Sequence, residues 1–220
     1  MDKKKKNKPD KTWTASVLEG LKAQHPDAKP ELVFSNPYEL LIATVLSAQC
    51  TDKQVNKCTP ALFAAYPTPA DLAKAEPADI EPYIRSCGFY HTKSVNIVAA
   101  CRDIADKFEG RVPDTREGLE SLAGVGRKTA NVVLSNAFGV PAIAVDTHVF
   151  RVSNRIGLAS ADNVAETEKQ LMENIPEDTW SIAHHWLIFH GRRVCSAKKP
   201  KCGECFIKEL CRAYREKESK

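Results

Sequence analysis

Lys128 and Asp146 are the two side chains whose positions in the sequence best suit bond-making chemistry. Lys128 follows a glycine-containing turn, residues 122–126, where a helix is expected to begin. A lysine acts as a nucleophile only as the free amine, and the positive end of a helix dipole and partial desolvation both lower a lysine pKa. Lys128 is therefore a candidate nucleophile. A solvated surface lysine or a phosphate contact accounts for the same position equally well.

Asp146 ends an apolar run, residues 140–145, and is followed directly by Thr147 and His148. Its carboxylate could activate a lysine amine and offset positive charge that develops on a substrate. An aspartate in this position is also a common helix N-cap, so a purely structural role stays open. His148 could contact a phosphate, or it could be an ordinary, partly exposed residue at a helix start.

The turn before Lys128 reads Leu-Ala-Gly-Val-Gly and contains Gly124 and Gly126. Glycine accepts backbone angles closed to other residues and leaves neighbouring N–H groups unshielded by side chains. At the start of a helix, such N–H groups suit a phosphate. An apolar stripe from Ala130 to Ala137 has helical spacing, and Lys128 falls on the other side of that helix.

Four of the eight cysteines lie close together near the end of the chain: Cys195, Cys202, Cys205 and Cys211. They are separated by six, two and five residues. Structural zinc sites usually have two close cysteine pairs, each with about two to four intervening residues, and this pattern has only one. An iron–sulfur cluster is larger and tolerates wider spacing, so the pattern favours a cluster.

Lysines crowd the loop between the first two of these cysteines, at Lys198, Lys199 and Lys201. Anchoring both ends of the loop to a metal cluster would turn it into a shaped phosphate-binding surface. A second basic segment begins the chain, with six lysines and two aspartates in residues 1–12. Such a cluster also fits a polyanion partner. We favour a disordered tail over residues 1–11, because the segment lacks apolar periodicity.

The 220 residues carry a modest formal net charge of +4 and no apolar run long enough to span a membrane. We therefore expect a soluble intracellular protein, cytoplasmic or nucleoid-associated, that binds a polyanion and no membrane. A reducing compartment disfavours disulfides. The other four cysteines are expected to be small buried residues: Cys50, Cys58, Cys87 and Cys101.

Helical periodicity runs through the chain, and no segment alternates with period two for long enough to form a sheet. Residues 38–49 are apolar nearly all round, which predicts a buried central helix after the Asn36-Pro37 cap. A long helix after Gly88 is expected to bury a stripe that starts at Val95. Trp13, with the leucines after it, begins an apolar stripe near the start that needs covering by another segment.

The hairpin turn, Lys128 and the Val145-Asp146-Thr147-His148 segment closely resemble the endonuclease III branch of the helix-hairpin-helix DNA glycosylases, from about Leu32 to Cys211. One departure is Ala123, where the family usually has proline. The resemblance implies an all-α fold of two helical lobes. One is a central helical domain over residues 30–140, and the other is an iron–sulfur domain over residues 12–29 and 141–215.

The resemblance also assigns roles. Lys128 would attack the sugar C1′ with help from Asp146, the hairpin glycines would contact a phosphate, and the four cysteines would hold one [4Fe-4S] cluster. Gln49 would enter the space left by an extruded nucleotide, and Phe89 would wedge into the base stack where the family commonly has leucine. An ordinary helix-to-helix turn at Gln49 and a loop aromatic folded onto the core at Phe89 are the structural alternatives.

We therefore expect a monomeric base-excision repair enzyme that acts on damaged double-stranded DNA. It would be a bifunctional glycosylase that removes oxidised pyrimidines and cleaves the resulting abasic site by β-elimination, through a Schiff base on Lys128. A purely base-excising relative would lack the lysine. A non-catalytic hairpin module would need neither Lys128 nor Asp146 and would bind undamaged duplex equally well.

Overall fold

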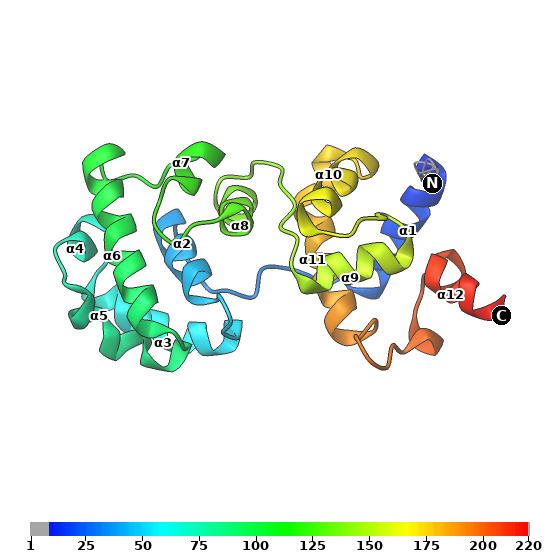
Figure 1. The fold of residues 1–220 in the computed structure, drawn as a ribbon, viewed down its shortest axis with the longest axis horizontal. Coiled ribbons are helices and arrows are strands. Elements are labelled where there is room, and N and C mark those ends of the chain that lie inside the picture. The colour runs from blue at the N-terminus through cyan, green and yellow to red at the C-terminus, as the bar shows by residue number, and fades with distance from the viewer. Residues whose placement is uncertain (1–8, 220) are drawn as a thin grey trace. The chain divides into compact units, whose positions relative to one another are not determined.

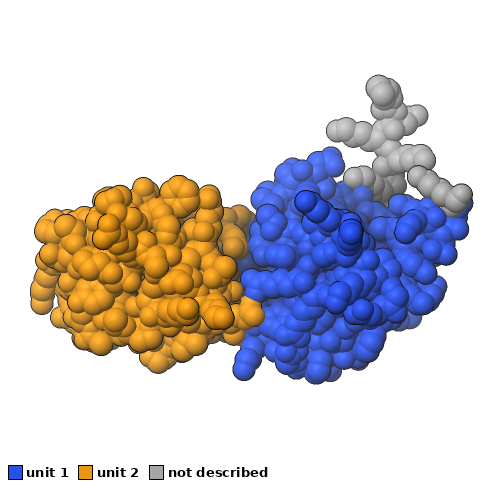
Figure 2. Space-filling model, turned by 90° about the horizontal axis from the view of Figure 1, so that it is seen from below, with its two compact units in different colours: residues 1–29, 141–220 blue, residues 30–140 orange. Residues whose placement is uncertain are grey.

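The computed structural model describes residues 9–219 and shows helices joined by turns (Figure 1). No strand occurs in that range, so the predicted all-α class is confirmed. The chain divides into two compact units, one of residues 30–140 and the other of residues 1–29 with 141–220 (Figure 2). None of the helices in the described range has the length and apolar character that a bilayer span requires.

The 30–140 unit contains seven α-helices and one 3-10 turn: α2 (Pro37–Leu46), α3 (Asp52–Ala65), α4 (Pro69–Ala73), α5 (Pro77–Ile84), η1 (Arg85–Cys87), α6 (Tyr90–Lys107), α7 (Arg116–Glu120) and α8 (Arg127–Ala137). The predicted central helix is α2, which is buried on nearly every face. Asn36 begins it as predicted, because its side chain accepts a 2.9 Å hydrogen bond from the Glu39 N–H.

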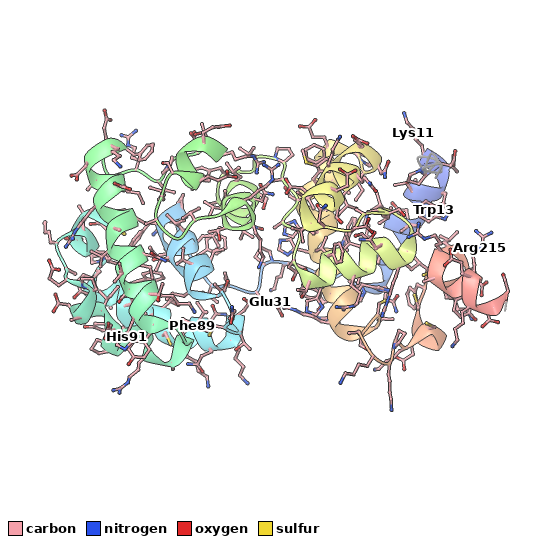
Figure 3. All side chains as sticks on the ribbon, viewed as in Figure 1. Lys11, Trp13, Glu31, Phe89, His91 and Arg215 are labelled. Atoms are coloured by element: carbon pink, nitrogen blue, oxygen red, sulfur yellow. The ribbon has the colours of Figure 1, made fainter. Side chains whose placement is uncertain are left out.

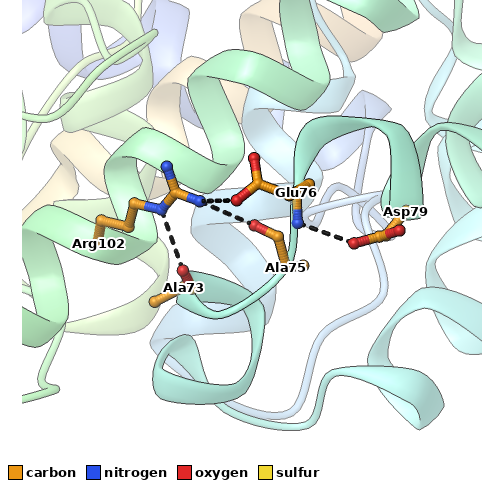
Figure 4. A network of polar contacts seen from close by, with 5 residues as sticks. All are labelled: Ala73, Ala75, Glu76, Asp79 and Arg102. Carbon is orange, nitrogen blue, oxygen red and sulfur yellow. Dashed lines mark hydrogen bonds and ion pairs between the residues drawn. The ribbon is translucent and has the colours of Figure 1, made fainter.

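Arg102 of α6 fastens the corner between α4 and α5 (Figure 4). Its guanidinium donates hydrogen bonds to the carbonyls of Ala73 and Ala75 and to the Glu76 carboxylate, at 3.0 to 3.1 Å. Asp79 in turn accepts from the Glu76 N–H at 2.9 Å, which closes the start of α5. Side-chain hydrogen bonds thus satisfy backbone groups at the ends of two short helices.

The buried face of α6 differs from the predicted one. Val95, expected to start the buried stripe, is 54% exposed, whereas Lys93 is only 5% exposed. Ile97, Cys101 and Ile104 carry the apolar part of the buried face. Val98 and Ile104 are buried as predicted, so the prediction is wrong mainly at the start of the helix, where a lysine lies in the interior.

The other unit combines the first helix with the C-terminal third of the chain: α1 (Lys11–Gln24), α9 (Thr147–Ile156), α10 (Val164–Asn174), η2 (Glu177–Thr179), α11 (Trp180–Arg193), η3 (Cys202–Glu204), η4 (Lys208–Leu210) and α12 (Arg212–Glu218). Val17 and Leu21 of α1 pack in one core with residues of α9 and α11, so the early stripe is covered as predicted. Trp13 is partly buried against that core, and its Nε1 donates to the Leu210 carbonyl at 3.2 Å (Figure 3).

The predicted tail ends earlier than expected. Asp10 caps α1, with its side chain accepting from the Thr12 and Trp13 N–H groups, and the helix begins at Lys11. Residues 10 and 11 thus belong to a capped helix, because an aspartate directly before a helical stripe is a strong N-terminal signal. Residues 1–8, which hold the rest of the predicted tail, lie outside the described residues.

Candidate functional site

The predicted hairpin is formed by α7, a short turn and α8. The side chains of Leu122 and Val125 are buried and anchor the turn in the core. The Val125 N–H donates a hydrogen bond to the Leu122 carbonyl at 3.1 Å. Gly124 has φ 75°, and a Cβ there would lie 2.9 Å from the Asn96 Cβ. Only glycine fits this position without strain, because both the backbone angle and the neighbouring helix exclude a side chain.

Gly126 is glycine for a different reason. Its backbone is extended, with φ −99° and ψ 177°, and a Cβ built there would meet no atom within 4 Å. Gly126 is also the N-cap of α8 and provides no side-chain cap for the helix. The first N–H groups of an α-helix have no partners within the helix, so this open, uncapped start suits an anion that approaches the backbone.

Lys128 lies in the first turn of α8, two residues after Gly126, and its side chain is exposed. The sequence predicted that Lys128 lies near a helix start and is partly desolvated. In the described part of the chain it lies at the helix start, but its side chain is not desolvated by burial. An exposed amine at the positive end of a helix is placed to reach a bound molecule. Lys128 belongs to the 30–140 unit.

Asp146 belongs to the other unit and is half-buried at the start of α9. Its Oδ1 accepts a 2.7 Å hydrogen bond from the Val149 N–H, so the capping role that the sequence left open is realised. Residues 142–145, directly before it, are buried. The cap engages Oδ1, so Oδ2 is the carboxylate oxygen that the cap does not use.

His148 contacts Arg151 one turn along α9, with 3.2 Å between its Nδ1 and the Arg151 Nη2. A guanidinium can only donate, so the imidazole Nδ1 accepts, and the proton of the neutral ring lies on Nε2. The same Nη2 donates to the Gly191 carbonyl at 3.0 Å. A Cβ at Gly191 would approach the His148 Cβ to 2.9 Å, so this glycine permits the close packing of α9 on α11.

Gln49 and Phe89 both stand immediately after a buried helix or turn and are exposed, as predicted. Their φ angles are 53° and 49°, in the left-handed region that residues other than glycine seldom adopt. Phe89 is 66% exposed at the N-terminal end of α6, so the alternative in which it folds onto the core is wrong (Figure 3). An exposed aromatic in a strained conformation is a candidate for contact with another molecule.

The four C-terminal cysteines are half-buried and form no disulfide, and all lie within the 141–220 part of one unit. Among residues 9–219, no three His, Cys, Asp or Glu side chains converge on a point that would hold a single metal ion. Backbone N–H groups nonetheless point at the sulfurs, from Ile207 to Cys205 and from Tyr214 and Ala213 to Cys211. Spread thiols with amide donors fit a cluster better than one zinc ion.

Burial raises the pKa of the Cys205 thiol to about 11, and the neighbouring Cys195, Cys202 and Cys211 raise it further while the Ile207 N–H lowers it. Two nitrogen-bearing side chains also approach these sulfurs. His190 Nε2 lies 3.7 Å from the Cys205 Sγ, and Arg155 Nη1 lies 3.5 Å from the Cys195 Sγ. Hydrogen-bond donors around cluster sulfurs are a usual means of stabilising the ligands.

The basic loop is held by α9. Arg155 donates to the Ser196 carbonyl at 2.7 Å and to the Ala197 carbonyl at 2.8 Å. Lys198, Lys199 and Lys201 remain exposed. Lys201 forms a 3.6 Å ion pair with Glu204, an acid just beyond the lysine segment. Such an exposed pair contributes little and leaves the surface basic.

Of the remaining cysteines, Cys58, Cys87 and Cys101 are buried as predicted, and Cys50 is only half-buried. Cys50 is the exception because it lies in the turn between α2 and α3 rather than inside a helix.

Sequence reasoning missed Lys93, Arg151, Arg155 and the buried pair of His25 and His190, whose ring nitrogens lie 3.1 Å apart. Their partners lie far away in the sequence, and nothing local signals them. The arginines of α9 had one weak signal, because they recur with helical spacing on the helix that Asp146 begins.

Two family models match the chain. One, for the HhH-GPD superfamily of base excision DNA repair proteins, covers residues 42–177. The other, for the iron–sulfur binding domain of endonuclease III, covers residues 195–211 and so includes all four C-terminal cysteines. The hairpin and the cysteine cluster are thus matched independently.

Curated relatives and solved structures agree. Endonuclease III of Haemophilus influenzae is 48% identical over 94% of this chain and 98% of its own, and that of Bacillus subtilis is 49% identical over 89% and 90%. A structure of a trapped covalent intermediate of endonuclease III with DNA superposes with a TM-score of 0.89 and 50% identity, covering 96% of this chain and 99% of that one. A non-covalent complex of endonuclease III with DNA has the same TM-score and identity.

The match to whole relatives, the hairpin and the cysteine spacing lead to one assignment. The chain belongs to the endonuclease III family and is a DNA-binding base-excision repair enzyme, a DNA glycosylase and AP lyase with one [4Fe-4S] cluster held by its C-terminal segment.

Proposed function

We propose that this enzyme removes oxidised pyrimidines from double-stranded DNA with Lys128 as its nucleophile, and then cuts the strand by β-elimination. The observation that carries the proposal is the exposed Lys128 amine in the first turn of the uncapped helix α8. A relative that is 50% identical has been trapped in a covalent intermediate with DNA, which supports covalent chemistry in this chain. An exposed amine beside a phosphate-binding turn is suited to attack a sugar carbon.

In the first step, the Lys128 Nζ forms a bond to C1′ while the glycosidic bond breaks, and the base leaves with that electron pair and takes up a proton. Ring opening then gives a Schiff base between Nζ and C1′. Loss of a C2′ proton expels the 3′ phosphate and breaks the strand. Water finally hydrolyses the imine and returns the free amine.

Asp146 acts as the general base in these reaction steps. Its Oδ1 is engaged with the Val149 N–H, so Oδ2 is the oxygen proposed to take the proton from the lysine amine. The negative charge of the carboxylate also offsets the positive charge that develops on the sugar in the transition state. Positioning by the helix cap keeps this oxygen in a fixed orientation.

Other residues would hold and deform the DNA. Gly124 and Gly126 shape a turn that receives one phosphate, and Lys198, Lys199 and Lys201 contact others with His148 as a further donor through Nε2–H. Gln49 fills the space left by the extruded nucleotide and Phe89 wedges into the stack, because both are exposed at strained turns. The cluster holds the basic loop in shape when bound.

The experiment uses purified holoenzyme and duplexes that each contain one defined lesion: thymine glycol, a dihydropyrimidine, urea or a pyrimidine dimer. Oxidised pyrimidines should be released with strand cleavage, and borohydride should leave protein attached to the DNA. Lys128→Gln should abolish trapping and cleavage while the visible absorption of the cluster is kept. A full-strength covalent band from that variant would assign the chemistry to another amine.

The proposal also includes a monomer that acts on the chromosome in the cytoplasm or nucleoid. Light scattering of the holoenzyme, with and without a duplex, measures its mass and so checks that it is a monomer. A mass of two chains per duplex would contradict it.

A further inference from the structure

Lys93 is the buried lysine of the 30–140 unit, and its amine is shared between two segments that are distant in sequence. Its Nζ donates to the Leu46 carbonyl at 2.9 Å and to the Cys87 carbonyl at 2.7 Å. Its own backbone N–H donates to the Phe89 carbonyl at 3.0 Å. One residue thus joins α2, η1 and the first turn of α6.

Both acceptors are terminal groups. Leu46 is the last residue of α2 and Cys87 is the last residue of η1. Carbonyls at a helix C-terminus lack partners within the helix, and a cation is favoured there by the helix dipole. Burial lowers the pKa of the Lys93 ammonium, while the Cys50 and Cys87 thiols act in the opposite direction. Burying this amine is unfavourable unless its hydrogen bonds are made.

The two strained, exposed residues follow these carbonyls closely. Gln49 comes three positions after Leu46, and Phe89 comes two positions after Cys87, with φ angles of 53° and 49°. Phe89 begins α6 without a side-chain cap hydrogen bond. Left-handed conformations at residues other than glycine persist only where the surrounding structure holds them. The groups that hold these two turns are therefore the ones to find.

We infer that Lys93 is a positioning residue, which fixes the end of α2 to the end of η1 and so holds Gln49 and Phe89 in register to enter one DNA duplex together. This inference rests on the insertion roles proposed above for Gln49 and Phe89. It adds that the two insertions are coupled through one buried amine.

A purely structural lysine would make a different prediction. Loss of stability alone reduces the amount of folded enzyme, and it lowers the rate on every substrate by the same factor. Loss of register between the two inserted residues instead slows only the step in which the nucleotide leaves the stack. That step is demanding in paired duplex and nearly free at an unstacked site.

The test compares single-turnover excision of one lesion in paired duplex and in a mismatch bubble, with folded holoenzyme in excess. Lys93→Met removes the donors and keeps a similar length. We expect its rate on paired duplex to fall about tenfold more than its rate on the bubble, as for loss of a wedge. Lys107→Met is the matched control, because Lys107 is an exposed lysine at the other end of α6, paired with Asp103. It should leave the ratio of the two rates unchanged.

Phe89→Ala and Gln49→Ala show whether a negative result contradicts the insertion roles or only the coupling through Lys93. If neither shows a selective loss on paired duplex, the insertion roles fail and this inference fails with them. If they do and Lys93→Met loses equally on both substrates, only the coupling is overturned. In the double variant Lys93→Met/Phe89→Ala, the selective loss of rate on paired duplex should be smaller than the product of the losses of the two single variants, since both residues act on one step. Lys93→Gln keeps one donor group and serves the same comparison if the methionine variant does not fold.

Discussion

Asp146 Oδ1 accepts a 2.7 Å hydrogen bond from the Val149 N–H, so the proposed catalytic carboxylate is also the cap of α9. Two substitutions separate the roles. Asparagine caps helices as well as aspartate, whereas alanine does not. Asp146→Asn should therefore unfold at nearly the wild-type temperature and lose on the order of a hundredfold in excision rate, as expected for a missing acid–base group.

Asp146→Ala should show a similar loss of rate and also lower the free energy of unfolding by about 1 kcal/mol, the usual value of a cap. Denaturant unfolding of the two holoenzymes and single-turnover kinetics measure both effects. Equal stabilities would show that the cap contributes nothing, and a nearly wild-type rate for Asp146→Asn would remove the carboxylate from the mechanism.

Arg155 should control DNA affinity without touching DNA. It holds the Ser196 and Ala197 carbonyls at the base of the basic loop. Each phosphate contact by a lysine contributes roughly 0.9 to the slope of log affinity against log salt. Arg155→Met should lower that slope by about 1 to 2, because a loop without its anchor keeps fewer simultaneous contacts. Salt titration of duplex binding measures it.

Arg215→Met is the control for this change, because Arg215 is an exposed arginine on α12 of the same unit (Figure 3). It removes the same charge outside the loop, beyond Cys211, and should leave the slope unchanged. Iron and sulfide must be measured for each variant, since Arg155 also lies 3.5 Å from the Cys195 Sγ. An unchanged slope in Arg155→Met with a full cluster would mean that the loop keeps its shape unaided.

The hairpin, the buried helix α2 and the limits of α9 follow from local patterns in the sequence: glycine placement, an all-round apolar run, and an aspartate before a helical stripe. Lys93 does not. A lysine is almost never fully buried unless it is paired, and its partner Leu46 lies 47 positions away. The position at a helix start made Lys128 a candidate nucleophile, and the family resemblance then pointed to attack on the sugar C1′, because an exposed lysine at a helix start can equally well be a phosphate contact.

His185 should make the protein less stable in mild acid. Burial lowers its pKa from 6.5 to about 4. Between these values the unfolded chain takes up a proton that the folded chain does not, so the free energy of unfolding falls as the pH falls from 6.5 towards 4. The effect of one such group is on the order of 2 kcal/mol across that window.

His185→Phe keeps an aromatic ring and removes the titration. The variant should lose less stability than the wild type between pH 6.5 and 4, whatever its stability at neutral pH. A slope remains in the variant because burial also lowers the pKa of His190 to about 4. Denaturant unfolding at a series of pH values measures both slopes, and parallel curves would show that His185 takes up its proton in the folded state.

Replacing each of the two hairpin glycines by alanine should lower the stability to a different extent. Gly124 has φ 75° and would press a Cβ to 2.9 Å from the Asn96 Cβ, so Gly124→Ala should lower the free energy of unfolding by on the order of 1 to 2 kcal/mol. Gly126 has ordinary backbone angles and open space around its Cα, so Gly126→Ala should cost under about 1 kcal/mol, through the weaker N-cap.

The effects on DNA binding should have the reverse order, with Gly126→Ala weakening binding more than Gly124→Ala. If a phosphate approaches the backbone at Gly126, an added methyl group blocks it, and folded Gly126→Ala should bind duplex on the order of tenfold more weakly. Its salt slope should stay at the wild-type value, because a backbone N–H neutralises no phosphate charge, whereas loss of lysine contacts lowers the slope. Binding isotherms at several salt concentrations distinguish the two. Wild-type affinity for Gly126→Ala would place the phosphate elsewhere and leave the open start of α8 without a ligand.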